Sequence, residues 1–343
     1  MISTAKMQNN LTSIDTRCYN TAVTHQILIE NGIIWTFIQQ AIFWSNLLGC
    51  VLTWISFRYQ KRIPLLLLFT SCFADTMVAI CTYSLSVASY WLKRWVFGEF
   101  GCYYYALSRY FFQNFSFHVI VTSSIERLIS FVWPFLYDKH FALGFVNKVL
   151  FAITLYTGVV SLLPVFGPHS IKLRYPCTYC NFEWGSPDNQ AFAWVTIVNN
   201  LFGIILSISC NCIVIMALYK MTMKRRESRQ MAKRKGKRQM SDEKEMTCIL
   251  LLTSLAFCVS WLPHTIFISL RLFDSQNMLL GQGIHILELW TSRIVYANSI
   301  LSPYIYIFGR RRIRLKLCKW ATHEKVAKLN FPQSVSATRI DLS

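Results

Sequence analysis

Several ionisable side chains lie inside long apolar stretches of this 343-residue sequence. They are Asp75, Glu126, Glu288, Arg109, Arg127 and Arg293. A charge surrounded by hydrocarbon needs a partner, so such residues usually mark a binding site or a switch. A guanidinium can hold an anion through two charge-assisted hydrogen bonds. The sequence contains no nucleophile with a paired base, no metal-ligand spacing and no phosphate-binding loop. The pattern therefore predicts recognition of a charged group by a protein that is not an enzyme.

The stretches that carry these charges are long enough to cross a membrane. Hydrophobic residues make up 54% of the chain and charged residues only 15%, far from the soluble average. Crossing a hydrocarbon core takes about 20 residues. Segments of that kind are predicted at 33–57, 64–90, 102–132, 145–167, 191–219, 246–271 and 284–308. We therefore predict an all-α membrane protein, a bundle of seven transmembrane helices.

The distribution of basic residues predicts the orientation of this bundle. Lys and Arg number 35 against 16 acidic residues, an excess that in a soluble protein would suggest nucleic acid. Here they cluster between the apolar stretches, notably in 220–240 and 309–320, which is the positive-inside pattern. The predicted partners are thus membrane lipids and not nucleic acid. An odd number of spans places the N-terminus outside the cell, with 1–32 extracellular, 33–308 in the membrane and 309–343 cytoplasmic.

Two short motifs follow from this orientation. The first 30 or so residues lack the pattern of a cleavable signal peptide. Asn10 begins an Asn-Leu-Thr sequon on the outer face and is predicted to carry a glycan, whereas Asn114 begins a second sequon inside the third span, where no transferase could reach it. Basic and apolar residues alternate from Arg310 to Trp320, which predicts a short amphipathic helix on the inner leaflet. Cys318 there is either palmitoylated or a free interfacial thiol.

Five motifs, in spans one, two, three, six and seven, resemble those of rhodopsin-like, class A G-protein-coupled receptors. They are Asn46, Asp75 in FADTM, Glu126-Arg127-Leu128, Trp261 and Pro263 in FCVSWLP, and Ser302-Pro303-Tyr304-Ile305-Tyr306. Each motif is common by itself, but their shared order is specific. The resemblance covers the chain from about Asn46 to Phe308. It implies a receptor in the plasma membrane that signals through a heterotrimeric G protein.

The resemblance also implies roles for residues in the inner half of the bundle. Arg127 would switch between an acidic latch and the G protein, with Glu126 beside it and Glu243 as the resting latch. The alternative is that these charges only extend to the membrane interface. Tyr306 would take part in coupling, and Trp261 with Pro263 would form the switch. The last group, Asp75, Ser116 and Asn298, resembles a sodium pocket; alternatively, Asp75 is protonated and hydrogen-bonded. No other cofactor is expected.

Several departures from the general class pattern resemble the prostanoid receptors, in particular the prostaglandin E group. Glu126 replaces the Asp, and Leu128 the Tyr, that most members of the class have at these positions. Span four has no Trp and span five has no Pro. The loop LLPVFGPHSIKLRYPCTYCNFEW at 162–184 and the run SRIVYANSILSPYIYI in span seven also match that subfamily. Two residues do not fit the prostaglandin E group: Arg109 and Trp261 stand where it has apolar or small residues.

A prostanoid is an apolar chain with one carboxylate, so its site needs a lipid-like cavity and a buried cation. The resemblance implies Arg293 as that cation, with Tyr90 and Thr178 as hydroxyl partners. Alternatively, Tyr90 is an interfacial anchor and Thr178 serves a turn. Arg109 is a second candidate anchor, which leaves open another acidic lipid, and Glu288 could neutralise either arginine. A peptide receptor and a membrane transporter compete with this reading, although the sequence has no internal repeat of the kind expected in a transporter.

Four cysteines lie on the predicted outer side: Cys18, Cys102, Cys177 and Cys180. Four cysteines allow three connectivities. The resemblance implies a bridge between Cys102 and Cys180, which would tie the third span to the second outer loop. A Cys18–Cys177 bridge would then hold the N-terminus over the cavity.

Overall fold

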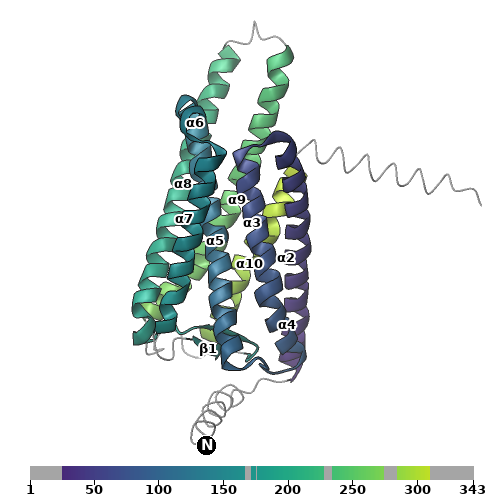
Figure 1. Cartoon of the computed structure of the whole chain (residues 1–343), viewed down its shortest axis with the longest axis vertical. Coiled ribbons are helices and arrows are strands. Elements are labelled where there is room, and N and C mark those ends of the chain that lie inside the picture. Colours follow the sequence, from purple (N-terminus) through teal and green to yellow (C-terminus); the bar gives the residue numbers. More distant parts are fainter. Residues whose placement is uncertain (1–24, 167–170, 175, 228–233, 274–283, 310–343) are drawn as a thin grey trace, which may run out of the picture.

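The computed structural model describes the backbone of residues 25–166, 171–174, 176–227, 234–273 and 284–309, and the side chains of 26, 28–166, 171–174, 176–221, 251–273 and 286–305. The long helical segments are α2 (His25–Gln60), α3 (Ile63–Val78) with the π-helical turn η1 (Ala79–Tyr83) and α4 (Ser84–Trp91), α5 (Gly98–Val132), α7 (Leu143–Leu162) with η2 (Leu163–Phe166), α8 (Gln190–Glu227), α9 (Arg234–Phe273) and α10 (Ile284–Gly309). Each predicted span falls on one of these segments. The seven-helix bundle is confirmed (Figure 1).

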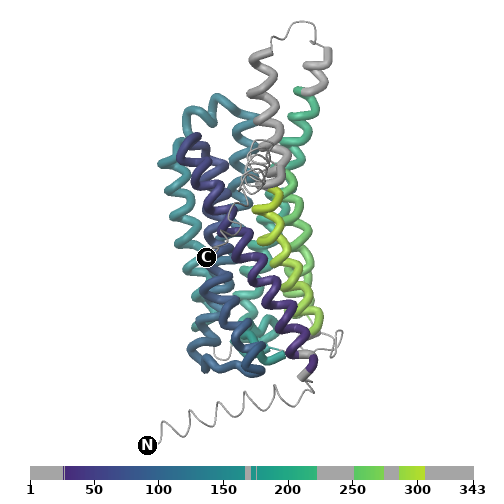
Figure 2. The backbone as a smooth tube through the Cα atoms, turned by 90° about the vertical axis from the view of Figure 1, so that its right-hand side faces the viewer, coloured from purple at the N-terminus to yellow at the C-terminus, as the bar shows by residue number. Residues whose placement is uncertain are grey.

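The bundle is organised around α5, which packs against α3, α7, α8 and α9. Helix α10 packs against both α9 and α2, so the helices nearest the two ends of the described part of the chain lie side by side (Figure 2). Six of the described segments are long and apolar enough to cross a membrane: Leu28–Gln60, Ile63–Trp91, Gly98–Val132, Leu143–Phe166, Pro187–Met221 and Leu251–Phe273. The seventh member, α10, carries the buried charges of Glu288 and Arg293.

Small residues allow the helices to approach one another closely. A Cβ added at Gly203 of α8 would lie 2.5 Å from the Phe117 ring of α5. Similarly, a Cβ at Gly49 of α2 would lie 2.9 Å from Cys72 of α3 and 3.0 Å from Pro303 of α10. These two glycines therefore fix how near α8 comes to α5, and α2 to α3 and α10.

A two-stranded hairpin covers the end of the bundle opposite the short helix α6 (Pro134–His140), as Figure 1 shows. Its strands β1 (Ile171–Arg174) and β2 (Tyr179–Phe182) are antiparallel, with Leu173 opposite Cys180. All four residues of β2 are buried. The Phe182 ring packs 4.9 Å from Phe192 of α8, centroid to centroid. We call this end of the bundle the hairpin end and the other the α6 end. A short turn, η3 (Pro187–Asn189), leads from the hairpin into α8.

Candidate functional site

The hairpin is fastened to the bundle by the predicted disulfide between Cys102 at the start of α5 and Cys180 in β2. Cys177 is also disulfide-bonded. Its expected partner, Cys18, lies outside the described residues, so that pairing stays a prediction. The bridge to α5 holds β2 directly against the helices that carry the predicted ligand-binding residues.

Arg293 and Tyr90 lie together in a cavity at the hairpin end. This Arg293 cavity is lined by Trp35, Ser86, Tyr90, Tyr105, Tyr179, Leu289, Ser292, Arg293 and Tyr296. The guanidinium of Arg293 donates a 2.6 Å hydrogen bond to Asn31 Oδ1 of α2 and lies 5.1 Å from the Trp290 ring centroid. Thr178 is completely buried beside Tyr90. All three residues predicted to hold the carboxylate are therefore neighbours, and Tyr90 lines a cavity instead of facing the membrane interface.

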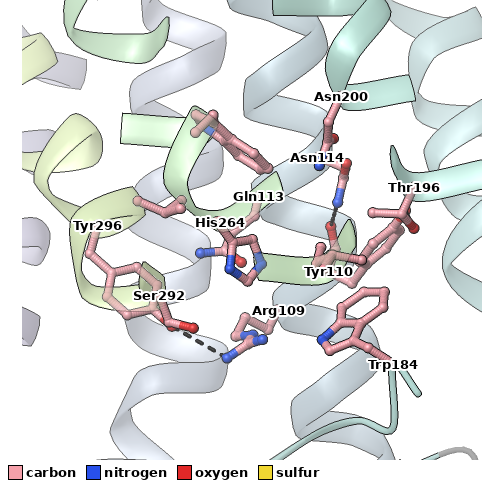
Figure 3. A pocket seen from close by; sticks show the side chains of 13 residues that line it. Arg109, Tyr110, Gln113, Asn114, Trp184, Thr196, Asn200, His264, Ser292 and Tyr296 are labelled. Carbon is pink, nitrogen blue, oxygen red and sulfur yellow. Dashed lines mark hydrogen bonds between the residues drawn. The ribbon is translucent and has the colours of Figure 1, made fainter. Parts of the chain in front are cut away.

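Arg109 lines a second cavity. Figure 3 shows Arg109 of α5 on one side of this Arg109 cavity, across from Asn200 of α8. The guanidinium donates hydrogen bonds to Asn181 Oδ1, at 2.7 Å, and to the Tyr296 hydroxyl, at 3.3 Å. Both acceptors are neutral, so the charge of Arg109 is not cancelled by them. Tyr296 and Ser292 line both cavities, so the two cavities adjoin.

Glu288 forms an ion pair with neither Arg109 nor Arg293, although its place in the sequence allowed one. Its carboxylate accepts a 2.6 Å hydrogen bond from Asn181 Nδ2 and lies 3.8 Å from Nε of Arg174 in β1. Within the described side chains, neither Arg109 nor Arg293 has a carboxylate within 4.0 Å. The reason is that the hairpin supplies its own cation for Glu288, which the sequence does not reveal.

A cluster of charges joins the hairpin to α9. The carboxylate of Glu183 lies 3.1 Å from Arg174, 2.9 Å from Arg271 of α9 and 3.4 Å from the half-exposed Lys172. Burial by itself would raise the pKa of Glu183, but the surrounding cations outweigh burial and hold that pKa below its ordinary value. This Glu183 cluster therefore fixes the hairpin over both cavities.

The residues predicted to couple to a G protein lie near the α6 end. Glu126 accepts a 2.6 Å hydrogen bond from the Tyr137 hydroxyl of α6. Arg127 donates to Ser123 of its own helix, to Ser254 of α9, both at 3.3 Å, and to Asn211 of α8, at 3.4 Å. Both charges are buried, so they do not simply extend to the interface. The side chains of Glu243 and Tyr306 lie outside the described residues, and their roles stay predictions.

The other two predicted groups lie between these ends. Asp75 is buried, and Ser116 and Ser299 are among its neighbours. Asn298 is buried as well, and its amide oxygen is 3.5 Å from the Ser302 hydroxyl. Trp261 lines the Arg109 cavity, and its ring lies 4.8 Å from the Phe117 ring of α5. Pro263, two residues on, lies inside α9.

The sequence matches the profile of the 7 transmembrane receptor (rhodopsin family) over residues 45–306. The chain belongs to this family. Its members are receptors and not enzymes. The fold is similar to that of squid rhodopsin, with a TM-score of 0.76 and 16% identity over 92% of this chain and 89% of that one.

Among proteins of similar sequence are prostaglandin receptors. This receptor is 23% identical to the human prostaglandin E2 receptor EP4 subtype over 310 residues, which are 79% of this chain and 63% of that one. It is 25% identical to the human prostaglandin F2-alpha receptor over 207 residues, 58% of this chain and 53% of the other. The match to the mouse prostaglandin E2 receptor EP2 subtype is 25% over 233 residues, 64% of this chain and 62% of that protein. The chain thus spans less than two thirds of the length of these relatives.

Several residues of the site were not predicted from the sequence. Asn181 links Arg109 to Glu288. Its position directly after Cys180 in the outer-loop motif was a sequence signal for a place close to the bundle. Asn31 lies 262 residues from its partner Arg293 and has no sequence signal. Asn200 and His264 line the Arg109 cavity of this receptor and are polar residues within apolar helices, a signal that could have been used.

Proposed function

We propose that this chain is a G-protein-coupled receptor activated by an extracellular acidic lipid, with a prostanoid of the prostaglandin E type as the preferred ligand. One observation carries the proposal. Two buried guanidinium groups, Arg109 and Arg293, line adjoining cavities, and the described side chains offer neither of them a carboxylate within 4.0 Å. A ligand carboxylate would supply the missing counter-charge. The prostaglandin receptors among its relatives support this choice of acid.

The recognition step follows from the Arg293 cavity. Arg293 binds the ligand carboxylate in competition with Asn31, a neutral acceptor that an anion can replace. The hydroxyls of Tyr90 and Thr178 donate to the same carboxylate. The aromatic and aliphatic walls, such as Trp35 and Leu289, exclude water and strengthen the ion pair.

The signalling step follows from the packing beneath the cavities. Trp261 contacts the ligand space on one side and Phe117 on the other. A ligand that shifts Trp261 therefore moves α9 relative to α5. At the α6 end, the same two helices are joined by the hydrogen bond from Arg127 to Ser254. Breaking it exposes Arg127 to a heterotrimeric G protein at the cytoplasmic face of the plasma membrane, and the N-terminus lies outside the cell. The buried Asp75 would supply the counter-charge for a sodium ion.

The direct test expresses the full chain in cells and measures cyclic AMP and calcium against a panel of prostanoids. A prostaglandin E compound should give the response at the lowest concentration, and cells without the receptor should give none. If no prostanoid responds at micromolar concentration while the receptor is present at the surface, the prostanoid ligand is wrong.

Arg109 favours a second candidate, a receptor for another acidic lipid. This arginine is buried and lines a cavity, and the prostaglandin E group has no counterpart for it. The same panel should therefore include other long-chain acids and phosphate-bearing lipids. A response to one of these at lower concentration than to any prostanoid would favour the second candidate.

A further inference from the structure

The Arg109 cavity has more hydrogen-bonding capacity than its own side chains use. Among the described residues, no partner exists for either amide atom of Asn200, or for Oδ1 of Asn114, Nδ1 of His264, Oγ of Ser292 and Nε of Arg109. All five side chains line this one cavity, and Asn200 and Asn114 are 1% and 4% exposed. Figure 3 shows the two amides on one side of the cavity, with His264 and Arg109 across from them. Polar atoms buried in this way are costly unless a bound group matches them.

The orientation of Asn114 indicates which chemical group fits. Its Nδ2 donates a 3.0 Å hydrogen bond to the carbonyl of Tyr110, so Oδ1 is the atom left for the cavity and it can only accept. An ionised carboxylate has no proton to donate and would leave Oδ1 unmatched. A hydroxyl both donates and accepts, so it can satisfy Asn114 together with the amide of Asn200. This cavity is therefore built for neutral oxygen groups and not for a second carboxylate.

The geometry of the two cavities allows one molecule to occupy both. Ser292 and Tyr296 line both cavities. Asn114 lies five residues beyond Arg109 along α5, which places it about 7.5 Å farther from the hairpin end. We propose that the Arg109 cavity binds the hydroxyl-bearing part of the same acidic lipid whose carboxylate Arg293 binds, and that Asn114 and Asn200 select it. This inference rests on the proposed function and names the ligand class, a hydroxylated long-chain acid and not a plain fatty acid.

The test compares two acids that have the same number of carbon atoms and the same terminal carboxylate. Prostaglandin E2 carries hydroxyl and keto oxygens, and arachidonic acid carries none. The purified full-length receptor is titrated with each acid, and thermal stabilisation provides an apparent Kd. The wild type should prefer prostaglandin E2 by roughly 100-fold or more, because a site built to bind hydroxyls rejects a ligand that lacks them.

The deciding variant is Asn200→Leu, which removes both amide atoms with little change of shape. It should weaken prostaglandin E2 binding by roughly 10- to 100-fold and change arachidonic acid binding by less than about twofold. The matched control is Asn199→Leu. Asn199 accepts hydrogen bonds from Tyr156 and pairs with His118, at 3.2 and 3.0 Å, and does not line the cavity, so this variant should keep the preference of the wild type.

The outcomes separate this inference from the function on which it rests. Equal affinity of the wild type for the two acids, or equal losses for both acids in Asn200→Leu, overturns only the selection of hydroxyl groups. If neither acid stabilises the wild type, the proposed prostanoid function fails and this inference fails with it. The ligand-free proteins provide a second measurement: Asn200→Leu should unfold at the same temperature as the wild type or higher. A lower unfolding temperature than that of Asn199→Leu would show that the amide supports the fold, and would overturn the inference.

Discussion

At the scale of single residues, the two cavity arginines differ in what holds them. Arg293 is bound by Asn31 and packs on Trp290, and it has predicted hydroxyl partners nearby. Arg109 is bound by Asn181 and Tyr296 and adjoins a cavity rich in neutral polar groups. These surroundings favour Arg293 for a carboxylate and Arg109 for the uncharged oxygens of a ligand.

Replacing Arg293 should therefore nearly abolish binding of the free acid. A carboxylate that loses its buried cation forfeits about 2 to 5 kcal/mol, or roughly 30-fold to several thousandfold in affinity. The methyl ester should bind the wild type weakly and lose much less in Arg293→Ala, because it cannot form the ion pair. Radioligand competition on membranes measures the affinity of the free acid and of the methyl ester for each receptor, after surface expression has been matched.

Arg109→Ala is the comparison for this experiment. It should weaken the free acid and the ester by similar factors, because Arg109 is expected to bind a part that both share. If Arg109→Ala abolishes binding of the acid while Arg293→Ala hardly changes it, the anchor lies in α5, and the prostanoid assignment gives way to another acidic lipid.

Arg127 provides a second experiment at this scale. Ser254 accepts from Arg127 at 3.3 Å and lies 3.2 Å from Ser124, so it joins α9 to α5. Ser254→Ala should raise basal signalling, measured as cyclic AMP or calcium at equal surface expression. The control is Ser269→Ala on the same helix, whose hydroxyl donates a hydrogen bond to the carbonyl of Thr265, one turn earlier in α9.

The latch predicted from the sequence is tested in the same assay. Glu243→Ala should raise basal signalling if Glu243 holds Arg127 at rest. Arg127→Ala should impair signalling while ligand binding stays intact.

For the Ser254 experiment, unchanged basal signalling in Ser254→Ala would show that the Ser254 hydroxyl does not restrain the resting receptor.

At the scale of elements, the hairpin depends on the Glu183 cluster. Glu183→Gln removes the charge that faces Arg174 and Arg271 and should lower the stability of the purified receptor by about 1 to 3 kcal/mol at neutral pH. Thermal unfolding measures this loss. Asp188→Asn, which changes an exposed carboxylate in the turn η3, should have no such effect.

The pH dependence of this difference has a definite sign. Because the pKa of folded Glu183 is lowered, its contribution to stability is complete above the unfolded value of about 4.3. It is lost as the pH falls through the still lower folded value. The difference in unfolding temperature between wild type and Glu183→Gln should thus be the same at neutral pH and at about pH 6, and should shrink at about pH 3. A difference that already disappears at about pH 6 would contradict the cluster.

The elements were predictable from sequence to different degrees. Apolar length located the helices, because a membrane span must satisfy its backbone internally over about 20 residues. The hairpin was not predicted, since its pairing joins short strands whose partners depend on tertiary contacts. The partner of Glu288 was missed for the same reason: Arg174 reaches it only through the fold of β1 against α10.

At the scale of the whole molecule, the orientation in the membrane can be tested through the sequon at Asn10. If the N-terminus is outside, the receptor from mammalian cells should migrate faster after glycosidase treatment, and Asn10→Gln should migrate like the treated wild type. Asn114 is buried in α5, so the sequon there should remain unmodified. A wild type that is unaffected by the glycosidase would contradict the glycan.

The site as a whole was predicted only where a family motif supplied the residue. Arg293, Tyr90 and Thr178 were placed together in this way. Asn31 and Asn200 were not, because hydropathy shows that a helix lies in the membrane but not how it is rotated about its axis. That rotation decides which polar residue reaches the cavity, and it is set by contacts between helices distant in sequence.

The π-helical turn η1 shows how such a rotation is set within one helix. It places one more residue in a turn than an α-helix holds, so every side chain after Tyr83 is turned by about 100° relative to an uninterrupted helix. Tyr90 and Ser86 reach the Arg293 cavity beyond this turn. The direction of the Tyr90 side chain therefore depends on the number of residues in this turn and not on the identity of any one of them. If these residues formed a regular α-helix with no residue removed, Tyr90 would be turned away from the carboxylate site. An alignment without a gap to a relative with a regular helix there would be out of register by one position from that point onward.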